Sequence, residues 1–196
     1  KFNKIIVFNE EQKIFWNDSL GLSNTISRDI LISNENQLLN LKERNITFND
    51  EIIFGYLGRI SREKNLEDMI LLIDFLNSKN NKKCKLIIQG NGDLEYLNEL
   101  ELLVIKYDLS NFVTFKKEFI SPIKTHAFYQ NINVFLVTSK LEGGPITALE
   151  ATAPGCYVMG YNIGAMEERF RNKQFIVNQN FEQLCVSTLN FVNLPA

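Results

Sequence analysis

From residue 52 onward, short apolar runs alternate with helical patterns, and this alternation restricts the fold more than any other feature of the chain. The runs are rich in β-branched residues and predict buried strands at residues 52–57, 84–88, 112–115, 134–137, 156–159 and 175–177, with an earlier strand at 5–8. Helices are predicted at residues 10–20, 65–76, 94–107, 123–130, 146–153, 165–170 and 181–191. Strands and helices in alternation call for an α/β fold with a parallel sheet and right-handed crossovers.

The predicted helix at 65–76 has the clearest pattern. Asn65 precedes it as an N-cap, and Asp68 stands three residues later, in the position of a capping box. Its apolar residues share one face at helical spacing. They are Leu66, Met69, Ile70, Ile73 and Leu76.

Residues 1–46 do not continue this alternation. They contain one predicted strand, one helix and a short strand at 30–33, followed by a polar stretch at 34–37. We therefore expect residues 1–46 to connect to another domain and residues 47–196 to form the α/β domain. The chain begins with Lys1 rather than Met, which suggests a processed or truncated protein.

Composition excludes several classes of protein. Lys and Arg number 21 against 23 Asp and Glu, so the chain lacks the basic excess that drives nucleic-acid binding. Cys84, Cys156 and Cys185 are far apart and show no C-x-x-C spacing, which predicts free thiols in a reducing cytosol rather than a zinc site or disulfides. No apolar run approaches the roughly 20 residues that span a bilayer, and the first residues lack the pattern of a signal peptide.

The segment from Ser139 to Glu150 contains the most informative chemistry. Gly143 and Gly144 allow a backbone to approach a ligand closely, and Pro145 is well placed to open a helix. A helix N-terminus suits a phosphate, and a carboxylate beside it can accept hydrogen bonds from a sugar diol. Together these features suggest a nucleotide sugar, although Glu142 and Glu150 taken alone fit a structural role equally well.

Other loops at predicted strand ends add weaker signals. Gly58, Arg59 and Lys64 follow the strand at 52–57, where an Arg fork and a Lys can bind phosphate or can form an ordinary solvated loop. Gly90 and Gly92 follow the next strand, but no third glycine stands at the dinucleotide spacing, so the signal for NAD is weak. Further loops follow at 116–118 and 162–168. The carboxyl edge of a parallel sheet, where all these loops meet, is where such folds bind ligands.

These motifs resemble those of the retaining GT-B glycosyltransferases of the glycogen-synthase-like, group 1 type. The resemblance rests on the order and spacing of Gly58-Arg59, Lys64-Asn65, Gly90-Asn91-Gly92, Glu142 with Glu150-Ala151 and Gly155, and Gly164-Ala165-Met166-Glu167-Glu168, over roughly residues 50–180. It implies a Rossmann-like sheet with helices on both faces, as in the C-terminal, donor-binding half of a GT-B fold. Residues 1–46 would then be an interdomain segment or a remnant of the N-terminal domain.

The resemblance also implies the roles of the site residues. Arg59 and Lys64 would bind the donor diphosphate, Glu142 would contact the donor sugar, and Glu150 would hold the ribose hydroxyls. The base would lie near the end of the strand that reaches Phe115. The implied donor-binding residues are Gly58, Arg59, Lys64, Gly90, Gly92, Glu142, Gly143, Gly144, Pro145, Ile146 and Glu150, with catalytic roles for Arg59, Lys64 and Glu142. Glu35 stands where members commonly carry the glycine of an Asn-Gly pair in the interdomain region. Lys116 or Lys117 stands where many members carry a glycine after the base-site strand, which leaves the base preference open.

The implied activity is transfer of a hexose, with retention, from a UDP or GDP sugar to a glycan or lipid-linked acceptor in bacterial surface polysaccharide or glycoconjugate synthesis. The resemblance implies no cofactor, and the lack of an Asp-x-Asp pair agrees with a metal-independent site. It implies a cytoplasmic enzyme in which this chain alone is weakly active or inactive. The N-terminal GT-B domain of the same enzyme would be a partner and would carry any surface that docks on the inner membrane face. The alternatives are a non-catalytic nucleotide-binding or regulatory Rossmann module, an NAD-dependent oxidoreductase or nucleotide-sugar-modifying enzyme, and a phosphorylase of the same fold. His126 is expected at the surface.

Overall fold

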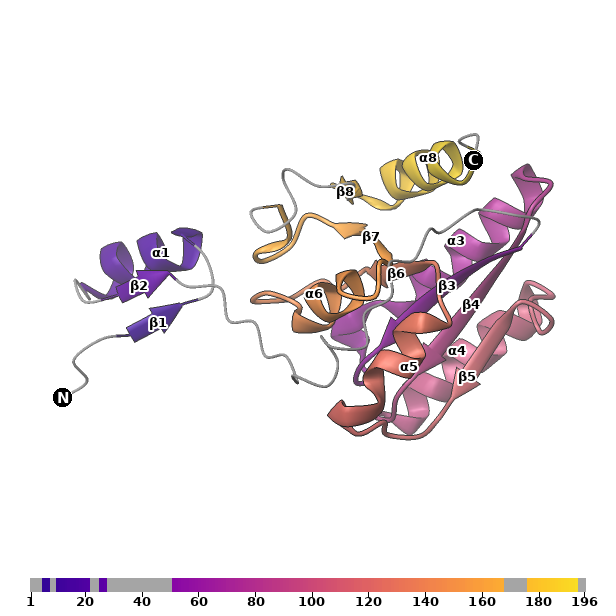
Figure 1. Cartoon of the computed structure of the whole chain (residues 1–196), viewed down its shortest axis with the longest axis horizontal. Helices are drawn as coiled ribbons and strands as arrows, with labels where there is room; N and C mark the ends of the chain where they lie inside the picture. Colours follow the sequence, from indigo (N-terminus) through magenta and orange to yellow (C-terminus); the bar gives the residue numbers. More distant parts are fainter. Residues whose placement is uncertain (1–4, 8–9, 22–24, 28–50, 168–175, 194–196) are drawn as a thin grey trace.

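A six-stranded parallel sheet forms the centre of the protein (Figure 1). In the computed structural model, residues 5–7, 10–21, 25–27, 51–167 and 176–193 are described. The strands are β3 (Glu51–Leu57), β4 (Lys83–Gln89), β5 (Val113–Lys116), β6 (Val134–Val137), β7 (Tyr157–Tyr161) and β8 (Ile176–Asn178), in the spatial order β5-β4-β3-β6-β7-β8. The chain thus runs outward from β3 to β5 and then returns to place β6 on the other side of β3. The crevice at this switch, beyond the carboxyl ends of β3 and β6, is where such sheets bind ligands.

Helices cover both faces of the sheet, because successive side chains of each strand point to opposite faces. Along β6, Val134 and Leu136 join a core with α3 (Leu66–Lys79), α4 (Leu94–Lys106) and α8 (Phe181–Val192). Phe135 and Val137 join a second core with α5 (Thr125–Gln130) and α6 (Ile146–Thr152). The Rossmann-like α/β prediction is therefore confirmed.

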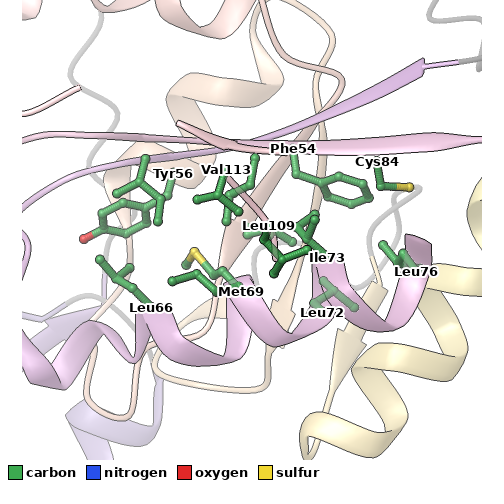
Figure 2. Packing of buried hydrophobic residues seen from close by; sticks show 14 of the residues in the cluster. Phe54, Tyr56, Leu66, Met69, Leu72, Ile73, Leu76, Cys84, Leu109 and Val113 are labelled. Atoms are coloured by element: carbon green, nitrogen blue, oxygen red, sulfur yellow. The ribbon is translucent and has the colours of Figure 1, made fainter. Parts of the chain in front are cut away.

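The larger core lies between α3 and the sheet. Phe54 and Tyr56 of β3 and Cys84 of β4 point down onto α3, which presents its apolar face upward (Figure 2). The residues of that face are Leu66, Met69, Ile70, Leu72, Ile73 and Leu76, all fully buried. The five residues predicted from the helical spacing are therefore all buried, and Leu72 belongs to the same face although it was not predicted.

The capping hydrogen bond predicted for the Asn65 side chain at the start of α3 is wrong. Asn65 stands at the N-cap position, but its backbone is left-handed, with φ 51°, and its side chain makes no capping hydrogen bond. Its Nδ2 instead donates to Oδ2 of Asp68 at 2.6 Å. The hydroxyl of Tyr96, on α4, accepts the hydrogen bond of the Leu66 N–H at 2.9 Å. A tertiary contact thus replaces the local cap.

Other differences concern short elements. The helix predicted at 123–130 is divided into the 3-10 turn η2 (Pro122–Lys124) and α5. Another 3-10 turn, η1 (Arg62–Lys64), lies between β3 and α3. Helical conformation begins at Met166 in the segment predicted at 165–170, and residues 168–170 of that segment lie outside the described residues, as does residue 175 of the strand predicted at 175–177.

The first described residues form a small β-α-β unit of their own. β1 (Ile5–Val7) and β2 (Thr25–Ser27) pair in parallel, and α1 (Glu10–Leu20) connects them. The strand and the helix predicted here are confirmed, whereas β2 was not predicted. The short strand predicted at 30–33 and the domain boundary predicted at 46/47 lie outside the described residues. No helix in the described part of the chain has the length and apolarity needed to cross a membrane.

Candidate active site

A cavity of about 330 Å³ lies at the carboxyl ends of β3 and β6, at the switch point of the sheet. The loop after β3 and the loop after β6 supply most of its polar wall. The residues of these loops and of the start of α6 that line the cavity are Gly58, Arg59, Lys64, Ser139, Glu142, Gly144, Pro145, Ile146 and Thr147. The sheet topology therefore brings together residues that are about 80 positions apart in the chain.

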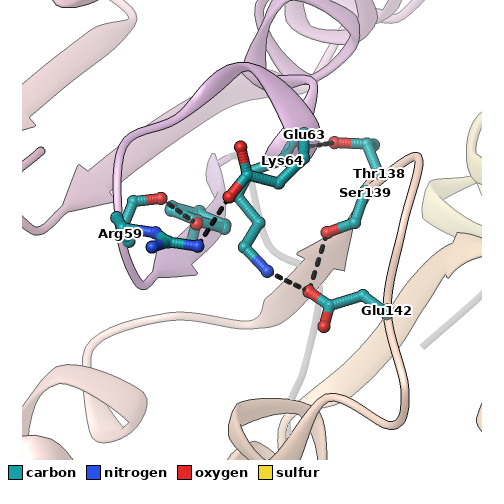
Figure 3. Close-up of polar contacts among 7 residues, drawn as sticks. Arg59, Glu63, Lys64, Thr138, Ser139 and Glu142 are labelled. Atoms are coloured by element: carbon teal, nitrogen blue, oxygen red, sulfur yellow. Dashed lines mark hydrogen bonds and ion pairs between the residues drawn. The ribbon is translucent and has the colours of Figure 1, made fainter. Parts of the chain in front are cut away.

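Lys64 and Glu142, which both line this cavity, contact each other (Figure 3). Nζ of Lys64 lies 2.5 Å from Oε1 of Glu142, and the hydroxyl of Ser139 donates to the same oxygen at 3.0 Å. The two charged side chains are only 17% and 18% exposed. The Thr138 hydroxyl donates to the backbone oxygen of Lys64 at 3.1 Å. Side chain and backbone of Lys64 are thus both attached to the segment that follows β6.

Arg59 has a fixed backbone and an exposed side chain. The Tyr56 hydroxyl donates to the backbone oxygen of Arg59 at 2.7 Å. Burial raises the pKa of Tyr56 well above its usual range, and the negative charge of Glu142 raises it further, so this hydroxyl keeps its proton. The Arg59 guanidinium is 69% exposed and pairs with Glu63 at 2.6 Å. Exposed pairs of this kind contribute little to stability.

A second cavity, of about 350 Å³, adjoins the first and shares Leu57, Gly58, Arg59 and Thr147 with it. The remainder of its wall comes from the loop after β4, the segment after β5, and α6. These residues are Gly90, Asn91, Phe119, Ile120, Pro122, Thr125 and Glu150. The two cavities together form one elongated site along the carboxyl edge of the sheet.

Backbone hydrogen bonds join the loops of this edge to one another. Gly58 N–H donates to Gln89 O at 3.1 Å, and Gly90 N–H donates to Lys116 O at 3.0 Å. A Cβ added at Gly90, where φ is +147°, would lie 1.9 Å from Gly58 O. A Cβ at Gly92 would lie 2.1 Å from the backbone oxygen of Ile60. Both glycines are therefore required by close backbone approach between loops.

Most predicted site residues line the two cavities, with two exceptions. Gly92 and Gly143 line neither of them. Gly143 packs instead against Gly164, where an added Cβ would lie 2.8 Å from the backbone of Gly143. The described part of the loop predicted at 162–168 thus contacts the Glu142 loop at Gly164.

The segment after β5 contributes to the second cavity only beyond its two lysines. Lys116 and Lys117 line neither cavity, and Lys117 pairs at 2.6 Å with Glu101 of α4. The cavity wall is formed further along the chain, by Phe119, Ile120, Pro122 and Thr125. The carbonyls of Lys116 and Glu118 accept hydrogen bonds from the Gln89 side chain at 3.2 and 2.7 Å. His126 is half-buried and also lines neither cavity.

Sequence reasoning missed several residues of the site: Ser139, Thr147, Phe119, Ile120, Pro122, Thr125 and, behind Glu150, Tyr129. Phe119 is the one with a detectable signal, since a large apolar residue stands in a charged loop beside a predicted strand end. It is 71% exposed. The hydroxyl residues gave no signal of their own, because a lone Ser or Thr occurs in any loop.

The fold and this site define an α/β protein of the GT-B glycosyltransferase kind. Residues 40–190 match the family described as glycosyl transferases group 1, and the chain belongs to that family. It is 30% identical over 121 residues to the capsular polysaccharide biosynthesis glycosyltransferase CapM of Staphylococcus aureus, a match that covers 61% of this chain and 30% of CapM.

Solved structures share the fold. A mutant of S. aureus TarM, crystallised in complex with fondaparinux, alpha-GlcNAc-glycerol and UDP, superposes with a TM-score of 0.79 at 19% identity, over 98% of this chain and 37% of TarM. The C-terminal domain of the group 1 protein LpcC of Francisella tularensis superposes with a TM-score of 0.64 at 21% identity, over 73% of this chain and 76% of that domain. The chain thus spans about a third of the length of CapM and TarM.

Proposed function

We propose that this chain contains the donor-binding domain of a retaining glycosyltransferase that transfers a hexose from a nucleoside-diphosphate sugar. The observation that supports this most strongly is the convergence of two cations and two carboxylates on one elongated site at the switch point. Arg59, Lys64 and Glu142 line the first cavity, and Glu150 lines the second. Residues 47–196 would form this domain, and residues 1–46 would lead from an N-terminal domain.

The first cavity would hold the sugar and the diphosphate, and the second would hold the nucleoside. Transfer breaks the bond between the anomeric carbon and a phosphate oxygen, and the electron pair stays on that oxygen. Arg59 and Lys64 are positioned to stabilise this charge, which needs no metal ion. The N-terminus of helix α6, which begins at Ile146 beside the cavity, would add the positive end of its dipole to these two cations.

Glu142 would orient the sugar through the hydroxyls that face its carboxylate. Oε1 already accepts from Lys64 and Ser139, and within the described residues no hydrogen bond reaches Oε2. A carboxylate oxygen accepts about two hydrogen bonds, so Oε2 is suited to receive sugar hydroxyls. Glu150 would receive the ribose hydroxyls in the second cavity.

The acceptor would be a glycan or a lipid-linked sugar in bacterial surface polysaccharide or glycoconjugate synthesis. Support comes from the relatives, since CapM is a capsular polysaccharide biosynthesis enzyme and the TarM mutant was crystallised with alpha-GlcNAc-glycerol. The acceptor would bind to the N-terminal domain, which would also carry any contact with the inner membrane face of a cytoplasmic enzyme.

A thermal-shift panel tests the proposal directly. The ligands are UDP, GDP and ADP, their common sugar conjugates, and NAD as the control. A ligand at about 100 times its dissociation constant should stabilise the protein by about 2.7 kcal/mol. Stabilisation by one nucleoside diphosphate, increased by one sugar and lost in Arg59→Ala, is the expected result. A response to NAD alone, or binding without transfer in the full-length protein, would contradict it.

A further inference from the structure

A buried tyrosine stands directly behind Glu150. The hydroxyl of Tyr129, on α5, donates to Oε2 of Glu150, on α6, at 2.8 Å. Tyr129 is 1% exposed, whereas Glu150 is half-buried and lines the second cavity. Tyr129 itself lines neither cavity. The contact therefore reaches the site from the core of the protein.

The position of this hydroxyl is tightly determined. The Tyr129 ring packs edge-on against Phe128 and Phe135, with ring centroids 5.7 Å apart in both pairs. The backbone oxygen of Tyr129 accepts a hydrogen bond from the thiol of Cys156 at 3.0 Å. Because ring and backbone are both held by the core, the hydroxyl cannot follow Glu150 if that side chain rotates. The Glu150 side chain must therefore adopt an orientation that reaches the hydroxyl.

The hydroxyl is also a permanent donor. Burial raises the pKa of Tyr129 above its usual range, and the negative charge of Glu150 adds to the effect. A glutamate side chain on a short helix otherwise loses considerable rotamer freedom when it binds a ligand. The fixed Tyr129 hydroxyl restricts the Glu150 side chain before a ligand binds. It leaves the other carboxylate oxygen, Oε1, for the cavity.

We propose that Tyr129 is a positioning residue that holds the Glu150 carboxylate in the orientation that receives the ribose hydroxyls of the donor nucleotide. This inference rests on the proposed function, because it takes the second cavity as the nucleoside site. Tyr129 acts through Glu150 and does not touch the ligand. Its removal should therefore affect ligands with a complete ribose diol more than ligands without one.

The test uses Tyr129→Phe in the full-length protein, titrated calorimetrically with UDP, 2′-deoxy-UDP, GDP and 2′-deoxy-GDP. Whichever ribonucleotide binds the wild type should bind the variant about fivefold more weakly, the size of one ordinary hydrogen bond. The matching 2′-deoxynucleotide should lose clearly less. Tyr161→Phe is the matched control, because its hydroxyl donates to Asp68 away from both cavities, and it should leave all affinities unchanged.

Equal weakening of both nucleotides, or none, would overturn the inference while the proposed function stands. If the wild type bound no nucleoside diphosphate at all, the proposed function and the inference would both be wrong. Misfolding is separated by a double-mutant cycle in the Glu150→Ala background, where Tyr129→Phe should cause no further loss of affinity. A full additional loss there would show that Tyr129 acts only through the stability of the core.

Discussion

Nζ of Lys64 lies 2.5 Å from Oε1 of Glu142, and this contact joins the loop after β3 to the loop after β6 across the switch point of the sheet. Arg59, the other cation that lines the first cavity, pairs with Glu63 of its own loop at 2.6 Å. Each cation is thus neutralised by a carboxylate. A phosphate that enters the cavity must compete with Glu142 for Lys64 and with Glu63 for Arg59. The two cases differ because the Lys64–Glu142 pair is mostly buried and the Arg59–Glu63 pair is exposed.

Lys64→Ala should lower both turnover and stability. Loss of the ammonium removes a cation from the leaving phosphate, and we expect turnover to fall about tenfold or more, which corresponds to about 1.4 kcal/mol. It also leaves the mostly buried Glu142 without its charged partner, at a cost of about 1 kcal/mol in the free energy of unfolding. Transfer assays and urea denaturation measure the two effects. Lys140→Ala is the control, since this exposed lysine lines neither cavity. Unchanged kinetics in Lys64→Ala would show that Lys64 does not bind the phosphate.

Arg59→Ala should lower turnover by a similar factor, about tenfold or more, while the denaturation midpoint stays where it is. The reason is that the pair with Glu63 is exposed and such pairs contribute little to stability. Arg62→Ala provides the comparison, because Arg62 lies three residues away and forms an exposed pair with Glu99 outside both cavities. Equal losses of turnover in the two variants would mean that the effect comes from the general charge of the loop rather than from Arg59.

Gly90→Ala should destabilise the protein more than Gly58→Ala. The new Cβ at Gly90 would meet the backbone oxygen of Gly58 at 1.9 Å, in a left-handed region of φ, so the strand-end loops must separate. At Gly58 the new Cβ would meet the Tyr56 hydroxyl at 2.7 Å, which a side-chain movement can relieve. We expect a cost of about 2 kcal/mol or more for Gly90→Ala. Equal unfolding free energies for the two variants would contradict the close approach of these loops.

The buried thiols should make the protein less stable at alkaline pH. Burial raises the pKa of Cys84 to about 12 and that of Cys185 to about 11. In the unfolded chain a thiol titrates near pH 8.5, so the folded state holds more protons above this pH. The contribution is complete below about pH 8.5 and is lost as the pH rises toward 11 to 12.

Urea denaturation at about pH 7.5 and about pH 10 measures this effect, and the midpoint should fall at the higher pH. The double variant Cys84→Ala with Cys185→Ala should show a smaller fall over the same range. Native protein should also react slowly with a thiol reagent, since all three cysteines are buried. Rapid reaction without unfolding would show that the thiols are accessible.

Local patterns were sufficient for the elements and for the edge at which the site lies. The apolar face of α3 could be recognised because side chains at helical spacing share one face whatever surrounds them. The carboxyl edge could be recognised because parallel strands connected by crossover helices all end there. Strand β2 was not predicted, because Thr25–Ser27 has neither the length nor the apolar content of a buried strand.

Residue types and their spacing were therefore enough to predict the α/β class, the apolar face of α3, and the loops that contain Arg59, Lys64, Glu142 and Glu150. Which of these groups meet depends on the packed fold. Lys64 and Glu142 pair, Tyr96 rather than Asn65 caps α3, and Tyr129 holds Glu150, across separations of 78, 30 and 21 residues. The physical reason is that periodicity and capping rules act within a few residues, whereas these contacts depend on how strand order and helix packing bring distant side chains together.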